Sequence, residues 1–252
     1  MKILGVIPAR YASTRFPAKP LADIAGKTMI EWVYNQASKS SKLDQVVVAT
    51  DNEKIFNHIK EKGGQVLMTS ENHVSGTDRC AEALQLTKEE FDYVINIQGD
   101  EPFIDPQQID LLASLLDSET QLATLIKKIK DPSALHNSNI VKVITNSNQE
   151  AIYFSRSALP HLRNVAPEEW LSKQVYFKHI GMYGYRSDIL AEITKLSPSS
   201  LEMAESLEQL RWIENGYRIK VAETEIESTG IDTPEDLARA VTQLQKNPKS
   251  DS

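Results

Sequence analysis

The chain of 252 residues has only one cysteine, no excess of positive charge and few long apolar runs. Its single cysteine, Cys80, excludes an intramolecular disulfide and a cysteine-rich zinc site, so we expect a buried free thiol. Because 28 basic side chains stand against 35 acidic ones, the net charge of −7 disfavours nucleic acid as a general partner. The first apolar run, residues 3–7, is too short for a signal-peptide core or a membrane span. We therefore expect a cytoplasmic protein with no membrane partner.

The loop after this first run lacks the two glycine-rich signatures of nucleotide binding. Neither G-x-x-x-x-G-K-[ST] nor G-x-G-x-x-G occurs in residues 7–21, which read "IPARYASTRFPAKPL". The loop instead carries three cations, Arg10, Arg15 and Lys19. Arginine grips phosphate oxygens in a bidentate way and lysine supplies a mobile point charge, so the loop predicts an anion site built from side chains. The alternative is that the cations are solvated or pair with the protein's own carboxylates.

Compact apolar runs alternate with segments of helical spacing over the first part of the chain. The runs lie in residues 2–7, 44–50, 64–69 and 92–102, and they predict buried parallel strands. The segments between them predict helices: "TMIEWVYNQASKSSK", "EKIFNHIKEKGG" and "GTDRCAEALQLTKEEF". Gly63-Gly64 is typical of a helix stop. This alternation indicates an α/β fold with a central sheet.

From about residue 120 the pattern becomes richer in β-strand signals, and it predicts an insertion or dimerisation lobe around residues 122–185. The chain then returns to strand, loop and helix, with Thr233-Pro234-Glu235 as helix-starting chemistry. We find no internal repeat, low-complexity segment or Gly/Ser-rich linker. We therefore expect a single domain over residues 1–246 and a flexible tail over residues 247–252.

Two further loops carry carboxylates where ligands of an open parallel sheet gather, beyond the carboxyl ends of the strands. Asp100 and Glu101 follow the apolar "YVINI", and Asp232 lies in "STGIDTPEDL" just before the last expected helix. Together with the cationic loop they predict a Mg²⁺ ion that bridges to phosphates. The structural alternatives are a charged turn at Asp100 and a helix N-cap at Asp232.

Several motifs, taken in order, resemble the 3-deoxy-manno-octulosonate (Kdo) cytidylyltransferases. They are "IPARYASTRFPAKPL", "VVVATD", "SGTDR", "NIQGDEP", "YFSR", "HIGMYGY", "LEQLR" and "TGIDTPEDL". The resemblance runs nearly end to end. It implies a Rossmann-like nucleotidyltransferase fold, with a central, mostly parallel sheet flanked by helices and a smaller β-rich dimerisation insertion. It also implies a homodimer that converts CTP and Kdo into CMP-Kdo and pyrophosphate for lipopolysaccharide biosynthesis. The sequence departs from many members at Ala18, where they have glycine, and at Asp78, where they have glutamate.

The resemblance assigns roles to individual residues. Arg15, Lys19 and Asp100 are implied to be catalytic, and Asp100 and Asp232 to hold Mg²⁺. The implied nucleotide-binding residues are Arg10, Arg15, Lys19, Ser75 and Gly76. The implied Kdo contacts are Arg79, Gln98, Arg156, His179, Tyr183, Glu208 and Gln209.

Read without the resemblance, two of these segments have ordinary structural interpretations. Period-two geometry places His179, Gly181, Tyr183 and Tyr185 on one strand face, where a core-facing aromatic strand is the simpler interpretation. Helical spacing over residues 201–216 gathers apolar side chains on one side and polar ones on the other, and such a polar face usually meets solvent. The apolar set is Met203, Leu207 and Leu210, and the polar set is Glu202, Glu205, Glu208 and Gln209.

Three alternative functions stay open at this point. A CMP-sialate synthetase would share the nucleotide half, although "HIGMYGY" and "LEQLR" resemble the Kdo enzymes. An amino-substituted Kdo is a closer rival as substrate. A non-catalytic nucleotide sensor or scaffold of the same fold is disfavoured, because such a protein need not keep Arg15, Lys19, Asp100 and Asp232 together.

Overall fold

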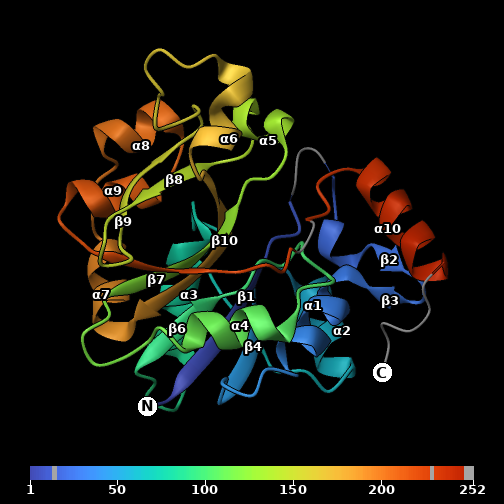
Figure 1. Ribbon diagram of the computed structural model, residues 1–252. Coiled ribbons are helices and arrows are strands. Elements are labelled where there is room, and N and C mark those ends of the chain that lie inside the picture. The colour runs from blue at the N-terminus through green and yellow to red at the C-terminus, as the bar shows by residue number, and fades with distance from the viewer. Residues whose placement is uncertain (13–15, 228–229, 247–252) are drawn as a thin grey trace. The chain divides into compact units, whose positions relative to one another are not determined.

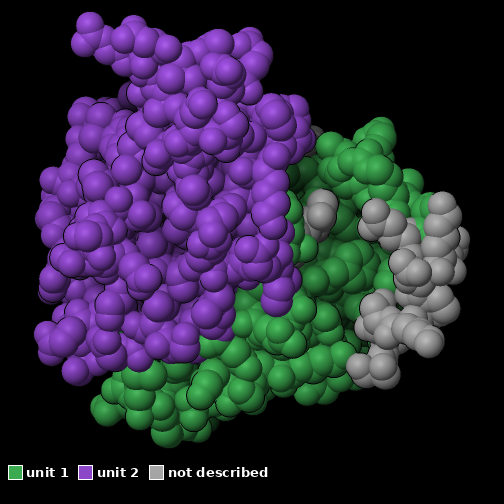
Figure 2. Space-filling view, viewed as in Figure 1, with its two compact units in different colours: residues 1–110, 227–252 green, residues 111–226 purple. Residues whose placement is uncertain are grey.

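A computed structural model describes residues 1–12, 16–227 and 230–246 of the chain. Arg15 and the expected tail over residues 247–252 lie outside these described residues. The chain divides into two compact units, one formed by residues 1–110 and 227–252 and the other by residues 111–226 (Figure 2). None of the helices that the structure describes combines the length and the apolar character needed to cross a bilayer.

Unit 1 contains four parallel strands in the spatial order β6–β1–β4–β5. Their bounds are Tyr93–Asn96 for β6, Ile3–Ala9 for β1, Gln45–Thr50 for β4 and Val66–Met68 for β5. The four predicted strands are therefore confirmed, and β1, β4 and β6 are almost entirely buried. The expectation of burial was wrong for β5, which lies at the sheet edge with Met68 exposed.

The helices predicted after β1, β4 and β5 and at the end of the chain are present, and a further helix, which was not predicted, follows β6 (Figure 1). Their bounds are Met29–Ala37 for α1, Glu53–Glu61 for α2, Gly76–Leu86 for α3, Pro106–Ala113 for α4 and Pro234–Lys246 for α10. Gly63 has φ of 79° just beyond α2, which confirms the predicted helix stop. Between β1 and α1 the chain forms the short 3-10 helix η1 (Lys19–Leu21) and the two-stranded ribbon of β2 (Asp23–Ile24) and β3 (Lys27–Thr28).

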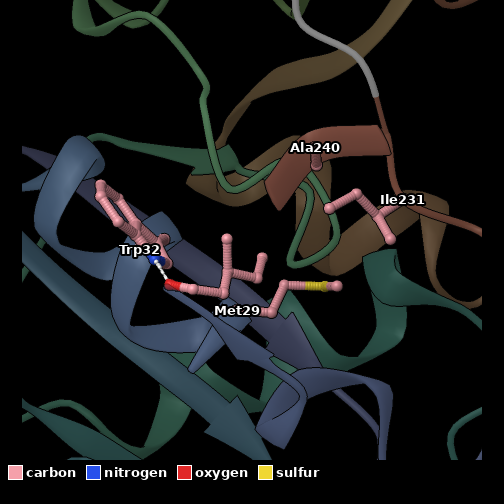
Figure 3. Packing of buried hydrophobic residues seen from close by; sticks show 5 residues of the cluster. Met29, Trp32, Ile231 and Ala240 are labelled. Carbon is pink, nitrogen blue, oxygen red and sulfur yellow. Dashed lines mark hydrogen bonds between the residues drawn. The ribbon is translucent and has the colours of Figure 1, made fainter. Parts of the chain in front are cut away.

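The C-terminal helix α10 belongs to the core of unit 1, although it is distant from β2 and α1 in the sequence. Figure 3 shows Met29 and Trp32 of α1 close to Ile231 and Ala240, and Ile24 of β2 completes this buried cluster. The Trp32 indole Nε1 donates a 2.8 Å hydrogen bond to the carbonyl of Ile24. Ile231 lies just before α10, and its buried side chain anchors this segment in the cluster.

Unit 2 contains a mixed sheet built around β7 (Leu122–Lys128). On one side β7 pairs with the antiparallel strand β10 (Phe177–Arg186), and on the other with the parallel strand β11 (Ile219–Glu223). The antiparallel pair β8 (Lys142–Thr145) and β9 (Ala151–Ser155) extends from the start of β10. The β-rich character predicted for this region is confirmed, whereas a dimerising insertion over residues 122–185 stays a prediction.

Short helices complete unit 2. They are α5 (Pro132–His136), η2 (Pro167–Glu169), α6 (Trp170–Lys173), α7 (Ser187–Ile193), α8 (Ser200–Glu205) and α9 (Gln209–Glu214). The single helix expected over residues 201–216 was wrong, because Ser206 adopts a left-handed conformation (φ 53°) that separates α8 from α9. The predicted faces are lost with it: Met203 is exposed and Gln209 is buried.

We predict that Ile231→Ala lowers the free energy of unfolding by about 2–5 kcal/mol, because it removes a fully buried side chain from the cluster that anchors α10. Urea denaturation measures this change. The exposed Ile152 provides a matched control, and Ile152→Ala should change the free energy by less than about 1 kcal/mol. Equal losses for the two variants would contradict the anchoring role of Ile231.

Candidate active site

The ammonium group of Lys19 lies between two carboxylates that come from distant parts of the sequence. Lys19 Nζ is 2.8 Å from Asp100 Oδ2 and 3.2 Å from Asp232 Oδ1, and it donates a third hydrogen bond of 2.9 Å to the carbonyl of Ile231. The Lys19 side chain is only 15% exposed. Three of the five charged residues predicted for the phosphate and metal sites therefore meet in unit 1.

Local backbone geometry brings the loops after β1 and β6 together. Lys19 opens η1, and the preceding Ala18 has φ of 57°, a left-handed conformation that costs an alanine about 1 kcal/mol more than a glycine. This explains physically why glycine suits the position at which the sequence departs from the family. Gly99 lies so close to β1 that a Cβ there would be 2.6 Å from the carbonyl oxygen of Pro8. Only glycine allows the loop before Asp100 to pack this closely.

Asp232 is positioned by its neighbour Ile231. The Ile231 side chain is buried in the α10 cluster, and its backbone N–H donates a 2.9 Å hydrogen bond to the carbonyl of Asp100. The N-terminus of α10 is capped by Thr233 and Asp236, which exchange hydrogen bonds in both directions. The Thr233-Pro234 helix start is thus confirmed, and the Asp232 side chain is directed to Lys19.

An open pocket of about 570 Å³ lies at these loops. It is lined by residues that follow β1, by residues that follow β6 and by the segment before α10. Among the predicted site residues, the structure brings Arg10, Lys19, Gln98, Asp100 and Asp232 into the lining. Gln98 was predicted to contact the sugar, and its position adds an amide to a pocket that is otherwise rich in charge.

The donor set of this pocket fits a hard divalent cation. In the part of the chain that the structure describes, no group of three or more His, Cys, Asp or Glu side chains could hold a metal ion by itself. Asp100 and Asp232 could supply two carboxylate oxygens, and Mg²⁺ is commonly held by one or two carboxylates together with substrate phosphates. Lys19 places a positive charge beside both carboxylates.

The start of α3 adjoins the same pocket. Ser75 is the N-cap of α3 and forms a capping box with Asp78. A Cβ on Gly76 would be 3.7 Å from Pro8, which lines the pocket. Arg10 donates a 2.8 Å hydrogen bond to the carbonyl of Val74. The predicted base-binding residues Ser75 and Gly76 therefore lie beside the cationic loop.

Arg79, a predicted sugar contact, is fully buried in α3. Its guanidinium group forms a 2.7 Å ion pair with Asp51 and donates a 2.6 Å hydrogen bond to Thr69 Oγ1. These partners follow β4 and β5, so Arg79 ties two strand ends to α3. A direct contact with a sugar requires the side chain to leave this pair, and the assignment stays a prediction.

A second group of predicted residues lies in unit 2. The rings of His179 and Tyr183 on β10 are 5.1 Å apart, and Tyr185 stacks beyond Tyr183 at 6.0 Å, so the predicted grouping of these three rings on one face is confirmed. Tyr183 and Tyr185 are buried, as the core-facing interpretation expected. Trp212 of α9 packs edge-on against both tyrosines.

Two buried polar atoms in this aromatic group have no hydrogen-bond partner among the described residues: the Tyr183 hydroxyl and Trp212 Nε1. Burial raises the pKa of Tyr183 well above its ordinary value, and the nearby Tyr185 and Glu208 add to the effect. The hydroxyl therefore keeps its proton and can donate it to a ligand. Sequence reasoning missed Trp212, and its place just after "LEQLR" was the signal that could have found it.

His179 is neutral in this group. Burial lowers the pKa of its imidazole from 6.5 to about 3. Thr124 Oγ1 lies 2.9 Å from His179 Nε2, 2.7 Å from the carbonyl of Met182 and 3.2 Å from the carbonyl of Ile180. The neutral imidazole therefore has a hydroxyl partner at Nε2.

Three other predicted sugar contacts lie in unit 2. The guanidinium group of Arg156 donates hydrogen bonds to the backbone carbonyls of Ser138, Glu205 and Ser206. Glu208 is the N-cap of α9, and the buried Gln209 begins that helix, which also carries Trp212. Arg156, Glu208 and Gln209 thus belong to the same unit as His179 and Tyr183, and their role stays a prediction.

Comparison with known proteins agrees with this arrangement. A sequence model described as cytidylyltransferase matches residues 4–221. Proteins named 3-deoxy-manno-octulosonate cytidylyltransferase from Cytophaga hutchinsonii and Parabacteroides distasonis are 57% and 55% identical, over 95% and 96% of this chain and 96% and 97% of theirs. A solved structure named CMP:2-keto-3-deoxy-manno-octonic acid synthetase complexed with CTP is 40% identical, with a TM-score of 0.90 over 98% of this chain and 99% of that chain.

The chain belongs to the 3-deoxy-manno-octulosonate cytidylyltransferase family. The resemblance stated from the motifs is thereby confirmed, as are the Rossmann-like α/β fold and the assignment to the nucleotidyltransferases.

We predict that His179 makes the stability of the chain depend on pH. Below pH 6.5 the unfolded histidine binds a proton, whereas the folded one stays neutral down to about pH 3, so stability falls as pH falls through this window. Between pH 7.5 and 5.5 the wild type should lose about 1 kcal/mol more than His179→Gln, measured by urea denaturation at each pH. The same pH dependence in both proteins would show that burial does not shift the pKa of His179.

Proposed function

We propose that this chain transfers the cytidylyl group of CTP to the anomeric hydroxyl of Kdo, releasing pyrophosphate and supplying CMP-Kdo for lipopolysaccharide biosynthesis. The observation that carries the proposal is the contact of Lys19 Nζ with Asp100 and Asp232 in the pocket after β1 and β6. The similarity in sequence and structure to a solved synthetase complexed with CTP, which covers nearly the whole chain, supports the proposal.

The triphosphate of CTP would bind the cations of the loop after β1. Lys19 and Arg10 line the pocket, and Arg15, outside the described residues, is proposed to join them. The anomeric oxygen of Kdo attacks the α-phosphorus, the bond from that phosphorus to the bridging oxygen of pyrophosphate breaks, and the anomeric proton is released. Negative charge grows on the departing pyrophosphate, so Lys19 and Arg15 stabilise the transition state electrostatically.

Asp100 and Asp232 would hold the divalent cation that a CTP-dependent transferase generally takes, and we propose Mg²⁺ in this role. When bound, the ion supplies charge neutralisation for the triphosphate. The protein's own contribution is electrostatic balance: the ammonium group of Lys19 lies beside both carboxylates and could also donate hydrogen bonds to phosphate oxygens.

Ser75 and Gly76 are proposed to receive the cytosine base, where the absence of a side chain on Gly76 leaves room beside Pro8. For Kdo, we propose His179, Tyr183, Arg156, Glu208 and Gln209 as contacts. The neutral His179 and the unpartnered Tyr183 hydroxyl are suited to hydrogen bonds with sugar hydroxyls. The remaining candidates, Arg79 and Gln98, lie in unit 1 and are kept as predictions.

We also propose that the protein acts in the cytoplasm as a homodimer. The single cysteine and the short apolar runs support the compartment. The family resemblance supports the homodimer, which analytical ultracentrifugation would test.

The proposed function is tested by measuring pyrophosphate release with CTP, Mg²⁺ and a panel of sugar acids. We expect Kdo to give the highest kcat/KM, with CTP preferred to ATP because a pocket sized for a pyrimidine does not admit a purine. Amino-substituted Kdo and sialic acid belong in the same panel. Higher kcat/KM for either of them, or equal use of CTP and ATP, would overturn the assignment.

The same assay tests the carboxylates. We predict that Asp100→Asn and Asp232→Asn each lower kcat by roughly two to three orders of magnitude, because each removes a charge that holds the cation against the phosphates. Asp131→Asn is the matched control: Asp131 caps α5, and asparagine caps helices equally well, so its kcat should stay normal. Near-normal turnover of Asp232→Asn with Mg²⁺ would show that Asp232 has no part in metal binding.

A further inference from the structure

The loop over residues 70–75, between β5 and α3, has no apolar anchor. Its one aliphatic side chain, Val74, is 82% exposed, so hydrophobic burial cannot fix the loop. Yet the carbonyl of Val74 is the acceptor for Arg10, and the next residue, Ser75, caps α3. Polar contacts must therefore determine where this loop lies.

The carboxylate of Glu82 on α3 accepts hydrogen bonds from the first residue of the loop and from a residue in its middle. Glu82 Oε2 accepts a 2.7 Å hydrogen bond from the backbone N–H of Ser70 and a 2.5 Å hydrogen bond from His73 Nε2. Glu82 and His73 are 28% and 20% exposed, so the pair is partly shielded from water. Inside the loop, Asn72 N–H donates to Ser70 Oγ, which orders only the first half.

The charge state of Glu82 fixes the direction of these hydrogen bonds. Burial by itself raises the pKa of Glu82, but the hydrogen bonds from Ser70 and His73 and the nearby positive charge of Arg79 hold it below its ordinary value. At neutral pH Glu82 is therefore an ionised carboxylate that only accepts. His73 must then donate its Nε2 proton, which orients the ring and the backbone that leads to Val74.

We propose that Glu82 and His73 form a positioning pair that holds the loop over residues 70–75 where Val74 receives Arg10 and Ser75-Gly76 receives the nucleotide. The inference rests on the proposed function and adds to it two residues that determine affinity for CTP without contacting it. Since the pair belongs to the nucleotide loop, it should leave the binding of Kdo unchanged.

The experiment compares Glu82→Ala, His73→Ala and the double variant in steady-state kinetics with CTP and Kdo. We expect each single variant to raise the KM for CTP by about tenfold and to leave the KM for Kdo within about twofold. The double variant should be no worse than the worse single variant, because the two residues act through one contact. Glu82→Gln, which keeps an acceptor oxygen, should recover most of the affinity.

Glu61→Ala, at the exposed end of α2, is the matched control and should behave as the wild type. A normal KM for CTP in Glu82→Ala, or losses in the double variant that multiply, would overturn the positioning pair while the proposed function stands. Equal effects on both KM values together with a lower melting temperature would also overturn it, by revealing a merely structural role. If Glu82→Ala does not fold, His73→Ala and Glu82→Gln decide by the same criteria. Absence of pyrophosphate release in the wild type would overturn both proposals.

Discussion

The contact of the Lys19 ammonium group with two carboxylates is the interaction on which the pocket of unit 1 depends. Asp100 and Asp232 would repel each other without a cation between them, and Lys19 meets both within 3.2 Å. The contact joins the loop after β1, the loop after β6 and the segment before α10. The same charges suit the proposed chemistry, because two carboxylates could hold a divalent cation and the lysine could donate to phosphate.

This contact can form only because the backbone around it is held by uncharged interactions. Gly99 allows the β6 loop to approach Pro8 without a clash, and Ile231 anchors the segment of Asp232 in the apolar cluster of α1, β2 and α10. The hydrogen bond from Ile231 to the carbonyl of Asp100 joins the two acidic segments directly. These uncharged interactions fix the backbone from which Lys19, Asp100 and Asp232 project.

The meeting of Lys19 and Asp100 could be predicted from sequence because the parallel strands β1 and β6 place their carboxyl ends at one edge of the sheet. Asp232 precedes α10, and the buried Ile231 brings it to the same place. Long-range partners could not be predicted in the same way. Arg79 pairs with Asp51 in the interior, and no sequence periodicity indicates such a pair. The break between α8 and α9 was missed because the Glu202–Arg211 ion pair and the Ser155–Glu205 hydrogen bond are tertiary contacts. The packing of Trp212 against the tyrosines and the His73–Glu82 hydrogen bond were not predicted for the same reason.

A crystal structure with CTP and Mn²⁺, located by anomalous scattering, tests the central claim most directly. The account predicts one Mn²⁺ bound to carboxylate oxygens of both Asp100 and Asp232 and to phosphate oxygens of CTP. It also predicts that Lys19 Nζ is displaced from the carboxylates and lies within hydrogen-bond distance of a phosphate. The account is contradicted if the ion binds elsewhere while Lys19 keeps both ion pairs, because the cluster would then serve only to hold the loops together.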